Sequence, residues 1–236
     1  MAESESRSPA DATSLDPSEV YRHRFQGDMA YRRALWRVLC QDYFQRFIDP
    51  SHAVLEIAAG QCEFINAIQA TTKLAIDINI DTRQYAAEDV EVLITASDEL
   101  QGIDDATIDT IFVSNFFEHI EKPAIARTFA ECFRVLRDGG RMLILQPNIR
   151  YVARDYWMFF DHITPLDDRT ICEIARLNGF EIERCIPRFL PFSTKSRLPK
   201  ALALVRLYLK VPLAWRLLGG QALVIARKPP SNPGNS

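Results

Sequence analysis

The sequence predicts an α/β fold: a doubly wound, mostly parallel sheet of seven strands, with a helix before it and insertions in its C-terminal part. Short apolar runs of four to six residues alternate with segments of helical periodicity along the chain. Continuous apolar runs are typical of parallel strands that are covered on both faces. A turn of small residues follows the first run at once. In such a sheet the ligand binds at the carboxyl ends of the strands.

The expected elements follow one another in a regular order. Residues 28–48 carry apolar side chains near helical spacing and predict a first helix. A second helix is expected from Pro123 to the pair Gly139–Gly140, because Ile125, Phe129, Phe133 and Leu136 form one apolar stripe. A third helix is expected over about 168–178, before Gly179. The expected strands are 53–58, 73–78, 91–95, 109–115, 141–146, 180–186 and 221–227.

The chain divides into one domain with two tails. Residues 1–18 and 229–236 are rich in small polar residues and proline, and we expect both to be disordered. Residues 19–228 form the expected domain. Within it, segments 147–166 and 188–218 exceed a minimal sheet, and we expect them on the side of the acceptor or as a lid.

Charge is distributed unevenly along this chain. The formal net charge is −3, yet the segment from Arg184 to Ser236 contains ten basic residues and no acidic one. Such asymmetry points to an anionic partner. Residues 198–218 combine a wide apolar face with a narrow basic stripe. This segment either packs against the fold or a second copy of the chain, forming a homodimer, or forms a lid or a peripheral contact with an anionic membrane.

Several classes of protein are excluded or disfavoured. The longest run without a charged residue has ten residues, too short to span a bilayer, and the N-terminus lacks the apolar core of a secretory signal. The five cysteines show no metal-ligand spacing with the four histidines, so we expect free thiols, no metal and a cytoplasmic location. No nucleic-acid-binding motif accompanies the basic residues.

The turn after the first strand, read as EIAAGQCEF from Glu56, indicates a nucleoside-containing cofactor. A small-residue turn lets a ligand approach the backbone, and we expect a helix N-terminus behind it. About twenty residues later Asp77 ends the second strand, where a carboxylate accepts the hydroxyls of a ribose. Glu56 has a second reading, as the acceptor for buried turn amides, and Asp77 has one as a helix cap. A dinucleotide site requires more glycines than Gly60 alone.

These motifs resemble the class I S-adenosylmethionine-dependent methyltransferases, whose first motif is E/D-x-G-x-G-x-G. Glu56 opens the motif here and Gly60 is its central glycine, while Ala58 and Cys62 replace the outer two. SNFFEHI (114–120) resembles the motif of the fourth strand, and RVLRDGGRMLILQPN (134–148) the helix, turn and fifth strand. PNIRYVARDYW, FFDHITPL and RFLPFSTKSRLPK resemble a bacterial branch linked to surface-glycan or secondary-metabolite biosynthesis.

The resemblance implies a Rossmann-like methyltransferase fold and S-adenosyl-L-methionine as cofactor. It implies that residues 58–62 line the methionine portion, that Asp77 binds the ribose and that the loop after Thr95 borders the adenine. The residues it assigns to cofactor binding are Glu56, Ala58, Gly60, Cys62, Asp77, Ile78, Ser97, Asp98, Asn115 and Phe116. The family's acidic residue aligns with Ala96 here, so either Asp98 takes its place or the main chain alone contacts the adenine.

Two histidines are candidate catalytic residues, because imidazole is a suitable general base near neutral pH. His119 follows the fourth strand beside Glu118, and His162 follows Asp161. Either histidine has an alternative role as a hydrogen-bonded structural residue. The candidate acceptor-binding residues are Arg150, Tyr151, Tyr156 and Trp157, since aromatic walls suit sugar or aryl faces, unless they only pack the loop onto the sheet.

The leading prediction is an enzyme that transfers a methyl group to oxygen or nitrogen of a small-molecule or sugar/glycan-type acceptor. The basic C-terminal segment favours an acceptor that carries phosphate. Two other functions remain open at this stage. One is an NAD(P)-dependent oxidoreductase on a similar sheet, and the other is a non-catalytic protein that binds S-adenosylmethionine.

Overall fold

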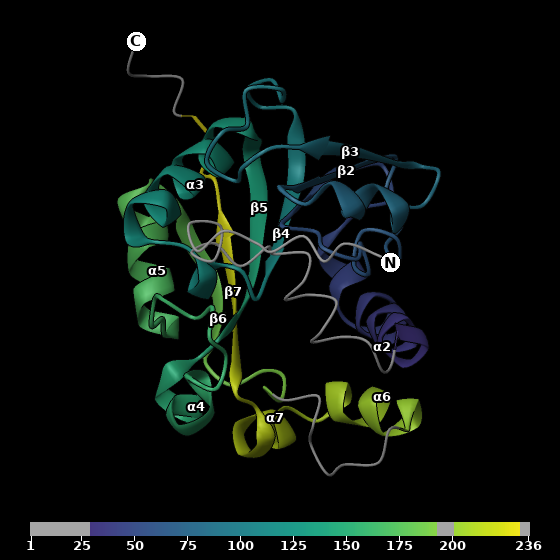
Figure 1. The fold of residues 1–236 in the computed structure, drawn as a ribbon, viewed down its shortest axis with the longest axis vertical. Coiled ribbons are helices and arrows are strands. Elements are labelled where there is room, and N and C mark those ends of the chain that lie inside the picture. The colour runs from purple at the N-terminus through teal and green to yellow at the C-terminus, as the bar shows by residue number, and fades with distance from the viewer. Residues whose placement is uncertain (1–28, 193–200, 232–236) are drawn as a thin grey trace, which may run out of the picture.

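The computed structural model describes residues 29–192 and 201–231, and it is built around one seven-stranded sheet of order β3-β2-β1-β4-β5-β7-β6 (Figure 1). The strands are β1 (Ala53–Ile57), β2 (Thr72–Asp77), β3 (Val90–Ile94), β4 (Ile108–Ser114), β5 (Leu136–Pro147), β6 (Glu181–Ile186) and β7 (Gln221–Arg227). All seven predicted strands are therefore present, and the predicted Rossmann-like sheet is confirmed.

The sheet is parallel from β3 to β5 and antiparallel at its other end. Strands β1, β2, β3, β4 and β5 pair in parallel. Strand β7 runs antiparallel to both β5 and β6, so it lies inside the sheet although it comes last among the strands. Because the parallel strands share one direction, β1, β2 and β4 end at the same edge, where a ligand would be bound.

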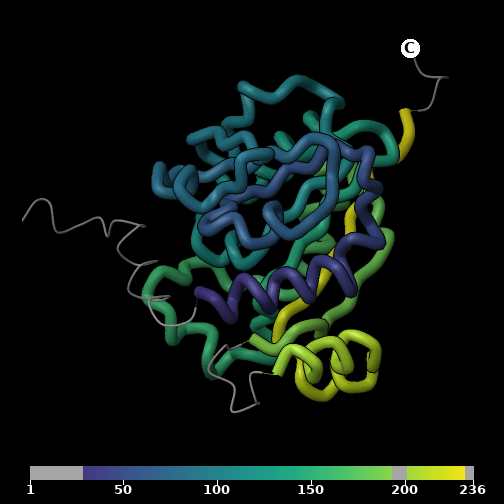
Figure 2. The backbone as a smooth tube through the Cα atoms, turned by 90° about the vertical axis from the view of Figure 1, so that its right-hand side faces the viewer, coloured from purple at the N-terminus to yellow at the C-terminus, as the bar shows by residue number. Residues whose placement is uncertain are grey.

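Apolar side chains from the sheet form two cores, one on each face. The first core packs beneath α2 (Met29–Asp42), α6 (Leu202–Lys210) and α7 (Pro212–Leu218) and contains Phe44, Phe112 and Trp215. The second packs beneath α3 (Lys122–Val135) and α5 (Asp168–Leu177) and contains Phe129 and Ile171. In Figure 2, the purple α2 crosses this side of the molecule, with the yellow-green helices α6 and α7 near its end.

Two predicted helices are shorter than the sequence pattern indicated. The first helix ends at Asp42 rather than residue 48, and the 3-10 turn η2 (Phe44–Phe47) follows because Tyr43 leaves the helical conformation. Helix α3 ends at Val135 rather than at Gly139–Gly140. Leu136 has extended dihedral angles and pairs with Ile108, so it begins strand β5. Strand pairing replaced the last helical turn that the apolar stripe predicted.

The prediction of a helix immediately after β1 was also wrong. Residues 60–68 form successive turns, and no α-helix separates β1 from β2 in this described part of the chain. Between β2 and β3 there is only the 3-10 helix η3 (Ile80–Gln84), and η4 (Phe117–His119) follows β4. A ligand at the β1 turn would therefore meet separate backbone N–H groups rather than the end of a helix.

The two predicted insertions contain short helices. Segment 147–166 includes α4 (Ile149–Tyr156), which has non-helical dihedral angles at Val152. Segment 188–218 includes α6 and α7, with Pro212 at the start of α7. The predicted tail 1–18 and residues 232–236 of the other tail lie outside the described residues. Among the helices that the structure describes, none has the length and apolar character needed to cross a membrane.

Candidate functional site

The turn after β1 has an unusual backbone. Ala58, Gly60 and Cys62 have positive φ angles of 52°, 53° and 56°. Glycine adopts this left-handed conformation freely, whereas alanine and cysteine carry a steric cost in it. Three alternating left-handed residues turn the chain sharply away from β1. Strain of this kind is concentrated at functional sites in proteins.

The carboxylate of Asp77 holds this turn against the end of β2. One oxygen accepts the N–H of Gly60 at 2.8 Å, and the other accepts the N–H of Asn79 at 2.9 Å. Burial raises the pKa of Asp77, and these backbone hydrogen bonds oppose that shift. Each oxygen keeps a further lone pair, so the carboxylate can accept two hydroxyl groups as well.

Glu56 and Cys62 point into the protein and support the turn from inside. Glu56 is 6% exposed and accepts the N–H of Ile65 at 3.0 Å, and burial raises its pKa well above the usual value. The Cys62 thiol is fully buried and lies 3.8 Å from the carbonyl oxygen of Thr82. Both side chains therefore pack the turn, which is the second reading that the sequence allowed for Glu56.

The residues at the ends of β1 and β2 fit a nucleoside cofactor. Asp77 offers two acceptor oxygens, and the turn offers backbone approach at Gly60. Ile78, directly after Asp77, is 63% exposed, which is unusual for isoleucine and provides an apolar surface beside the carboxylate. A carboxylate for a ribose and an apolar surface for a base are the contacts that such a ligand needs.

The predicted adenine-side residues after β3 are held by α3. The Ser97 hydroxyl lies 2.8 Å from that of Thr128, and Asp98 forms an ion pair with Arg127 at 2.7 Å. Thr95 donates its backbone N–H to the carbonyl of Asp77, which brings this loop next to the end of β2. The structure thus places Ser97 and Asp98 on the loop that borders the candidate site.

Asn115 and Phe116 follow β4 at the same edge of the sheet. Asn115 also has a positive φ, of 48°, and its side-chain oxygen accepts a hydrogen bond from Gln221 at 3.0 Å. Its backbone N–H donates to Leu145 of β5. Among the described residues, three of the four non-glycine positions with positive φ lie at the ends of β1 and β4, and the fourth is Ala106.

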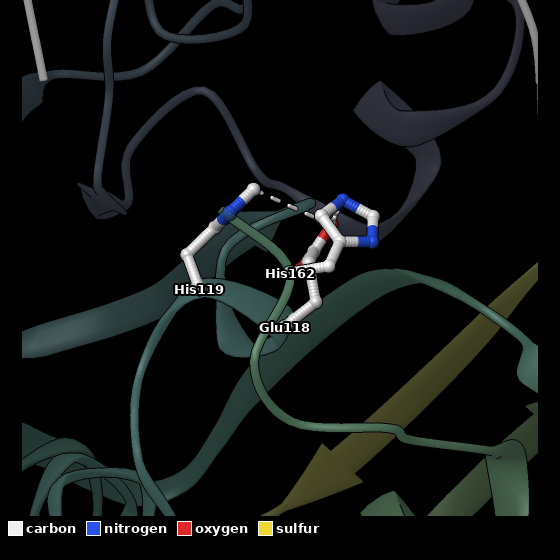
Figure 3. Close-up of side chains that lie close together, drawn as sticks. All are labelled: Glu118, His119 and His162. Atoms are coloured by element: carbon white, nitrogen blue, oxygen red, sulfur yellow. Dashed lines mark ion pairs between the residues drawn. The ribbon is translucent and has the colours of Figure 1, made fainter. Parts of the chain in front are cut away.

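Both predicted catalytic histidines belong to one cluster with Glu118. One oxygen of Glu118 lies 3.7 Å from Nε2 of His119 and 4.0 Å from Nε2 of His162 (Figure 3). The other oxygen accepts a hydrogen bond from Gln146 at 2.8 Å. The backbone carbonyl of Glu118 accepts the N–H groups of Ile163 and Thr164, which ties the 147–166 segment to the end of β4.

His119 is oriented by Asp161. Its Nδ1 lies 3.1 Å from the backbone oxygen and 3.2 Å from a carboxylate oxygen of that residue. Burial lowers the pKa of His119, but the contacts with Asp161 and the nearby Glu118 charge raise it more, and the pKa is raised overall. The side chain of His119 is 24% exposed, whereas that of His162 is 3% exposed. His119 is therefore the histidine that a ligand can reach.

The predicted acceptor-binding residues are divided by their surroundings. Tyr156 is fully buried, and its hydroxyl donates to the carbonyl of Thr164. Tyr151 and Trp157 are 40% and 54% exposed. Arg150 pairs with Asp168 at 2.8 Å. Tyr156 thus packs the loop, and the two exposed aromatic residues are free to contact a ligand.

Sequence reasoning missed the polar residues that support the cluster from other strands. Gln146, at the end of β5, is 1% exposed and donates to Glu118. Gln221, at the start of β7, donates to Asn115. Neither residue belongs to a recognisable motif. The only available signal was their polarity within apolar strand patterns, because buried polar groups require partners.

Comparison with known proteins identifies the kind of domain. Residues 55–144 match a family model described as a methyltransferase domain. No curated protein sequence matches the chain. Among solved structures, a SAM-dependent methyltransferase from Archaeoglobus fulgidus is similar with a TM-score of 0.65 and 19% identity, covering 90% of this chain and 100% of that one.

Two further solved structures have the same fold. A geranyl diphosphate C-methyltransferase from Streptomyces coelicolor, in complex with Mg²⁺, geranyl diphosphate and S-adenosyl-L-homocysteine, has a TM-score of 0.57 and 12% identity, covering 80% of this chain and 76% of that one. An S-adenosylmethionine-dependent methyltransferase from Mesorhizobium loti has a TM-score of 0.53 and 15% identity, covering 75% and 91%.

Proposed function

We propose that this S-adenosyl-L-methionine-dependent methyltransferase methylates oxygen or nitrogen of a small-molecule or sugar/glycan-type acceptor that carries phosphate. The observation that carries the cofactor half of the proposal is the contact between Gly60 and Asp77. That contact joins the turn after β1 to the carboxylate at the end of β2, which is the arrangement expected around a ribose.

S-adenosyl-L-methionine supplies an electrophilic methyl group, so the protein contributes mainly proximity and alignment. Asp77 would accept the ribose hydroxyls while it keeps its bonds to Gly60 and Asn79. Ile78 would cover one face of the base, and the loop with Ser97 and Asp98 would border its edge. Asn115 and Phe116 would lie beneath the cofactor, between it and the acceptor.

His119 is the proposed general base for a hydroxyl or amine acceptor. Asp161 occupies its Nδ1, so a neutral His119 would present the lone pair of Nε2. His162 is proposed to act through the same cluster, because it is buried against Tyr156 and Phe159. Tyr151 and Trp157, which are exposed aromatic residues of this segment, are the proposed acceptor contacts, with Arg150 over the ring of Tyr151.

The preference for phosphate rests on the charge of the C-terminal segment. Ten basic residues and no acidic one lie between Arg184 and Ser236. Such a segment attracts anionic ligands over several ångströms. The similar enzyme from Streptomyces coelicolor binds geranyl diphosphate, which is a phosphate-bearing acceptor, although it methylates carbon.

We also propose that helices α6 and α7 contact an anionic membrane surface. The apolar residues exposed on or between them are Leu204, Leu207, Val211, Leu213, Leu217 and Leu218. Arg206, Lys210 and Arg216 of the same helices are exposed too. Arg206 forms an ion pair with Asp42 of α2 at 3.3 Å, so Lys210 and Arg216 are the basic residues that we assign to the lipid contact. Apolar side chains combined with basic ones match the surface of anionic lipids better than that of a typical protein partner.

The central experiment measures methyl transfer from labelled S-adenosyl-L-methionine to a panel of sugar phosphates, nucleotide sugars and lipid diphosphates. The expected result is a product whose mass exceeds that of the acceptor by one methylene group. Dephosphorylated acceptors should react more slowly. Equal rates for both members of each pair would contradict the phosphate preference.

Cofactor binding is tested separately by calorimetry. Asp77→Asn should weaken binding of S-adenosyl-L-methionine by at least about tenfold, because one hydroxyl would lose an acceptor and the site would lose its charge. Asp81→Asn is the matched control, since Asp81 lies in η3 and is not predicted to touch the ribose. Equal affinities for the two variants would refute the role of Asp77.

The membrane contact is tested by sedimentation with vesicles of phosphatidylglycerol and phosphatidylcholine. We expect binding at low salt, loss of binding with phosphatidylcholine alone, and loss in the variant Leu213→Ser/Leu217→Ser. Failure to bind anionic vesicles would overturn this proposal. A concentration-dependent dimer that the same variant dissociates would assign the surface to a second copy of the chain instead.

A further inference from the structure

We propose that Glu118, His119 and His162 form a binding site for a divalent transition-metal ion, with Zn²⁺ as the best match. The three side chains each offer one ligand atom, and these atoms all lie within 4.8 Å of one another. They come from η4 and from the loop after α4, which meet through the backbone of Glu118 (Figure 3). This inference goes beyond the proposed methyl transfer and does not depend on the acceptor.

The hydrogen bonds around His119 leave its Nε2 directed into the cluster. Asp161 accepts at Nδ1, at 3.1 Å by its backbone oxygen and 3.2 Å by its carboxylate. A proton on Nδ1 makes Nε2 a lone-pair donor to a metal. This carboxylate–histidine pairing is the arrangement that orients histidine ligands in metal sites.

A hydrogen bond to one atom of Glu118 likewise leaves its other ligand atom directed into the cluster. One oxygen accepts the hydrogen bond from Gln146, and the second faces Nε2 of both histidines. The Glu118 side chain is 1% exposed, and among the described residues it pairs with no lysine or arginine. A buried carboxylate is costly unless a cation or a proton compensates it.

The distances favour a cation between the three groups over direct contacts. At 3.7 Å and 4.0 Å, the oxygen of Glu118 is too far from either Nε2 for a hydrogen bond. Metal–ligand bonds of about 2.0–2.2 Å place neighbouring ligand atoms about 3.0–3.5 Å apart. Metal binding would therefore draw the three atoms, which now lie within 4.8 Å of one another, closer together.

The ligand types select the metal. Two imidazole nitrogens and one carboxylate oxygen suit Zn²⁺, Co²⁺ or Fe²⁺, whereas Mg²⁺ and Ca²⁺ prefer oxygen ligands. Three protein ligands leave further coordination positions for water or another ligand. His119, at 24% exposure, is the member of the cluster nearest to solvent, so the open position would be on its side. The metal-loaded protein would hold a Lewis acid there in place of a free imidazole base.

The test measures metal content in the absence of cofactor and acceptor, so that it is independent of methyl transfer. The full-length protein, stripped with a chelator, is dialysed against Zn²⁺ or Co²⁺, passed over a desalting column and analysed by mass spectrometry of the elements. We expect one ion per chain, no displacement by excess Mg²⁺, and a visible absorption band for bound Co²⁺ shifted from that of the aqueous ion.

Variants identify the ligands. His119→Ala, His162→Ala and Glu118→Gln should each lower the affinity for Zn²⁺ by about a hundredfold or more. His52→Ala is the control, because His52 lies outside the cluster beside Thr110. Circular dichroism and binding of S-adenosyl-L-methionine show that each variant is folded. Glu118→Gln keeps the shape of the side chain and serves where a histidine variant does not fold.

Two results would overturn the proposal. In the first, the wild-type protein fails to retain Zn²⁺ or Co²⁺. In the second, the variants Glu118→Gln and His119→Ala retain the ion as well as the His52→Ala control does. In the first case the cluster holds its charge by protonation alone, and methyl transfer can still occur. Absence of methyl transfer with normal Zn²⁺ content would contradict the proposed function and leave the metal site standing.

Discussion

At the scale of single residues, the candidate cofactor turn combines strain with exact side-chain packing. Ala58 and Cys62 adopt a left-handed conformation at the two positions where the methyltransferase motif that this turn resembles has glycine. Cys62 uses its side chain, because the thiol is buried beneath η3. Ala58 is only partly buried, at the edge of the second core, so its methyl group offsets less of the backbone strain than the fully buried Cys62 side chain does. The two departures from the glycine pattern are therefore different in kind.

Ala58→Gly should stabilise the protein. A left-handed alanine costs about 1–2 kcal/mol, and the greater freedom of glycine in the unfolded chain cancels part of the gain, so we expect about 0.5–1 kcal/mol. Urea unfolding measures the difference. Ala59→Gly is the matched control, because Ala59 is buried and does not have a positive φ. This substitution should destabilise the protein. A loss of stability in both variants would show that Ala58 is not strained.

Glu131 on α3 should stabilise the protein at pH values above the ordinary pKa of a glutamate side chain. Its carboxylate binds Arg134 and accepts the N–H of Leu100, and the hydrogen bond from Arg134 holds the pKa of Glu131 below its usual value. A lowered carboxyl pKa contributes stability above the unfolded pKa of about 4.3, and that stability is lost as the pH falls through the folded pKa.

Glu131→Gln should therefore lower the free energy of unfolding by about 0.5–1 kcal/mol at pH 7. The difference from the wild type should shrink as the pH falls from about 5 towards 3. Chemical denaturation at a series of pH values measures this. Glu99→Gln, at an exposed residue of the loop between β3 and β4, is the control. A difference that stays constant across this range would exclude the charge as the cause.

At the scale of secondary-structure elements, Gly219 fixes the junction between α7 and β7. A Cβ atom there would lie 2.6 Å from the carbonyl oxygen of Trp215 and 2.7 Å from the backbone of Arg188. Gly219→Ala should cost about 3 kcal/mol, because only backbone atoms could move aside. Gly102→Ala is the control, as its nearest contact would be an ordinary 3.9 Å to Leu93. Equal unfolding midpoints would show that the junction yields easily.

The strands were predictable from sequence because burial on both faces produces continuous apolar runs. Strand β1 contains four buried residues out of five, and the sequence marks it clearly. The helices were less predictable where strand pairing competes with them. Leu136 continues the apolar stripe of α3, but its partner in the sheet is Ile108 of β4, which lies 28 residues earlier in the chain. Local periodicity contains no information about such a partner.

The candidate site was predictable in part for the same reason. Asp77 is the last residue of β2 and stands at a recognisable spacing from Gly60, so a local pattern indicated it. The metal-type cluster is different, because His162 lies on a separate loop and meets Glu118 only after the 147–166 segment folds back. The sequence predicted no metal ligands, since the cysteines and histidines show no metal-ligand spacing. Tertiary contacts, rather than motifs, created the cluster.

The two cores on opposite faces of the sheet share the same strands. On β5 and β7, Leu143 and Leu223 enter the first core, whereas Ile144 and Val224 enter the second. Loss of the helices on either face would expose one face of the same strands whose other face forms the remaining core. We therefore expect residues 29–231 to unfold in a single transition.

Two probes test this cooperativity. Trp36 and Trp215 both pack with the first core, so tryptophan fluorescence reports on that face. Hydrogen exchange of amides in α3 and α5 reports on the other face. The urea dependence of both signals should coincide. Trp157→Phe removes the exposed tryptophan and sharpens the fluorescence signal. Separate midpoints would show that each face is an independent folding unit.

The interior position of β7 has a consequence for folding during synthesis. Translation releases β1 to β5 first, and these parallel strands can pair as soon as each emerges. Strand β6 comes next, but its place in the sheet is beside β7, which has yet to be made. During that interval the edge of β5 is uncovered and β6 has no partner, so this is the stage at which a nascent chain would be most exposed to aggregation and most in need of a chaperone.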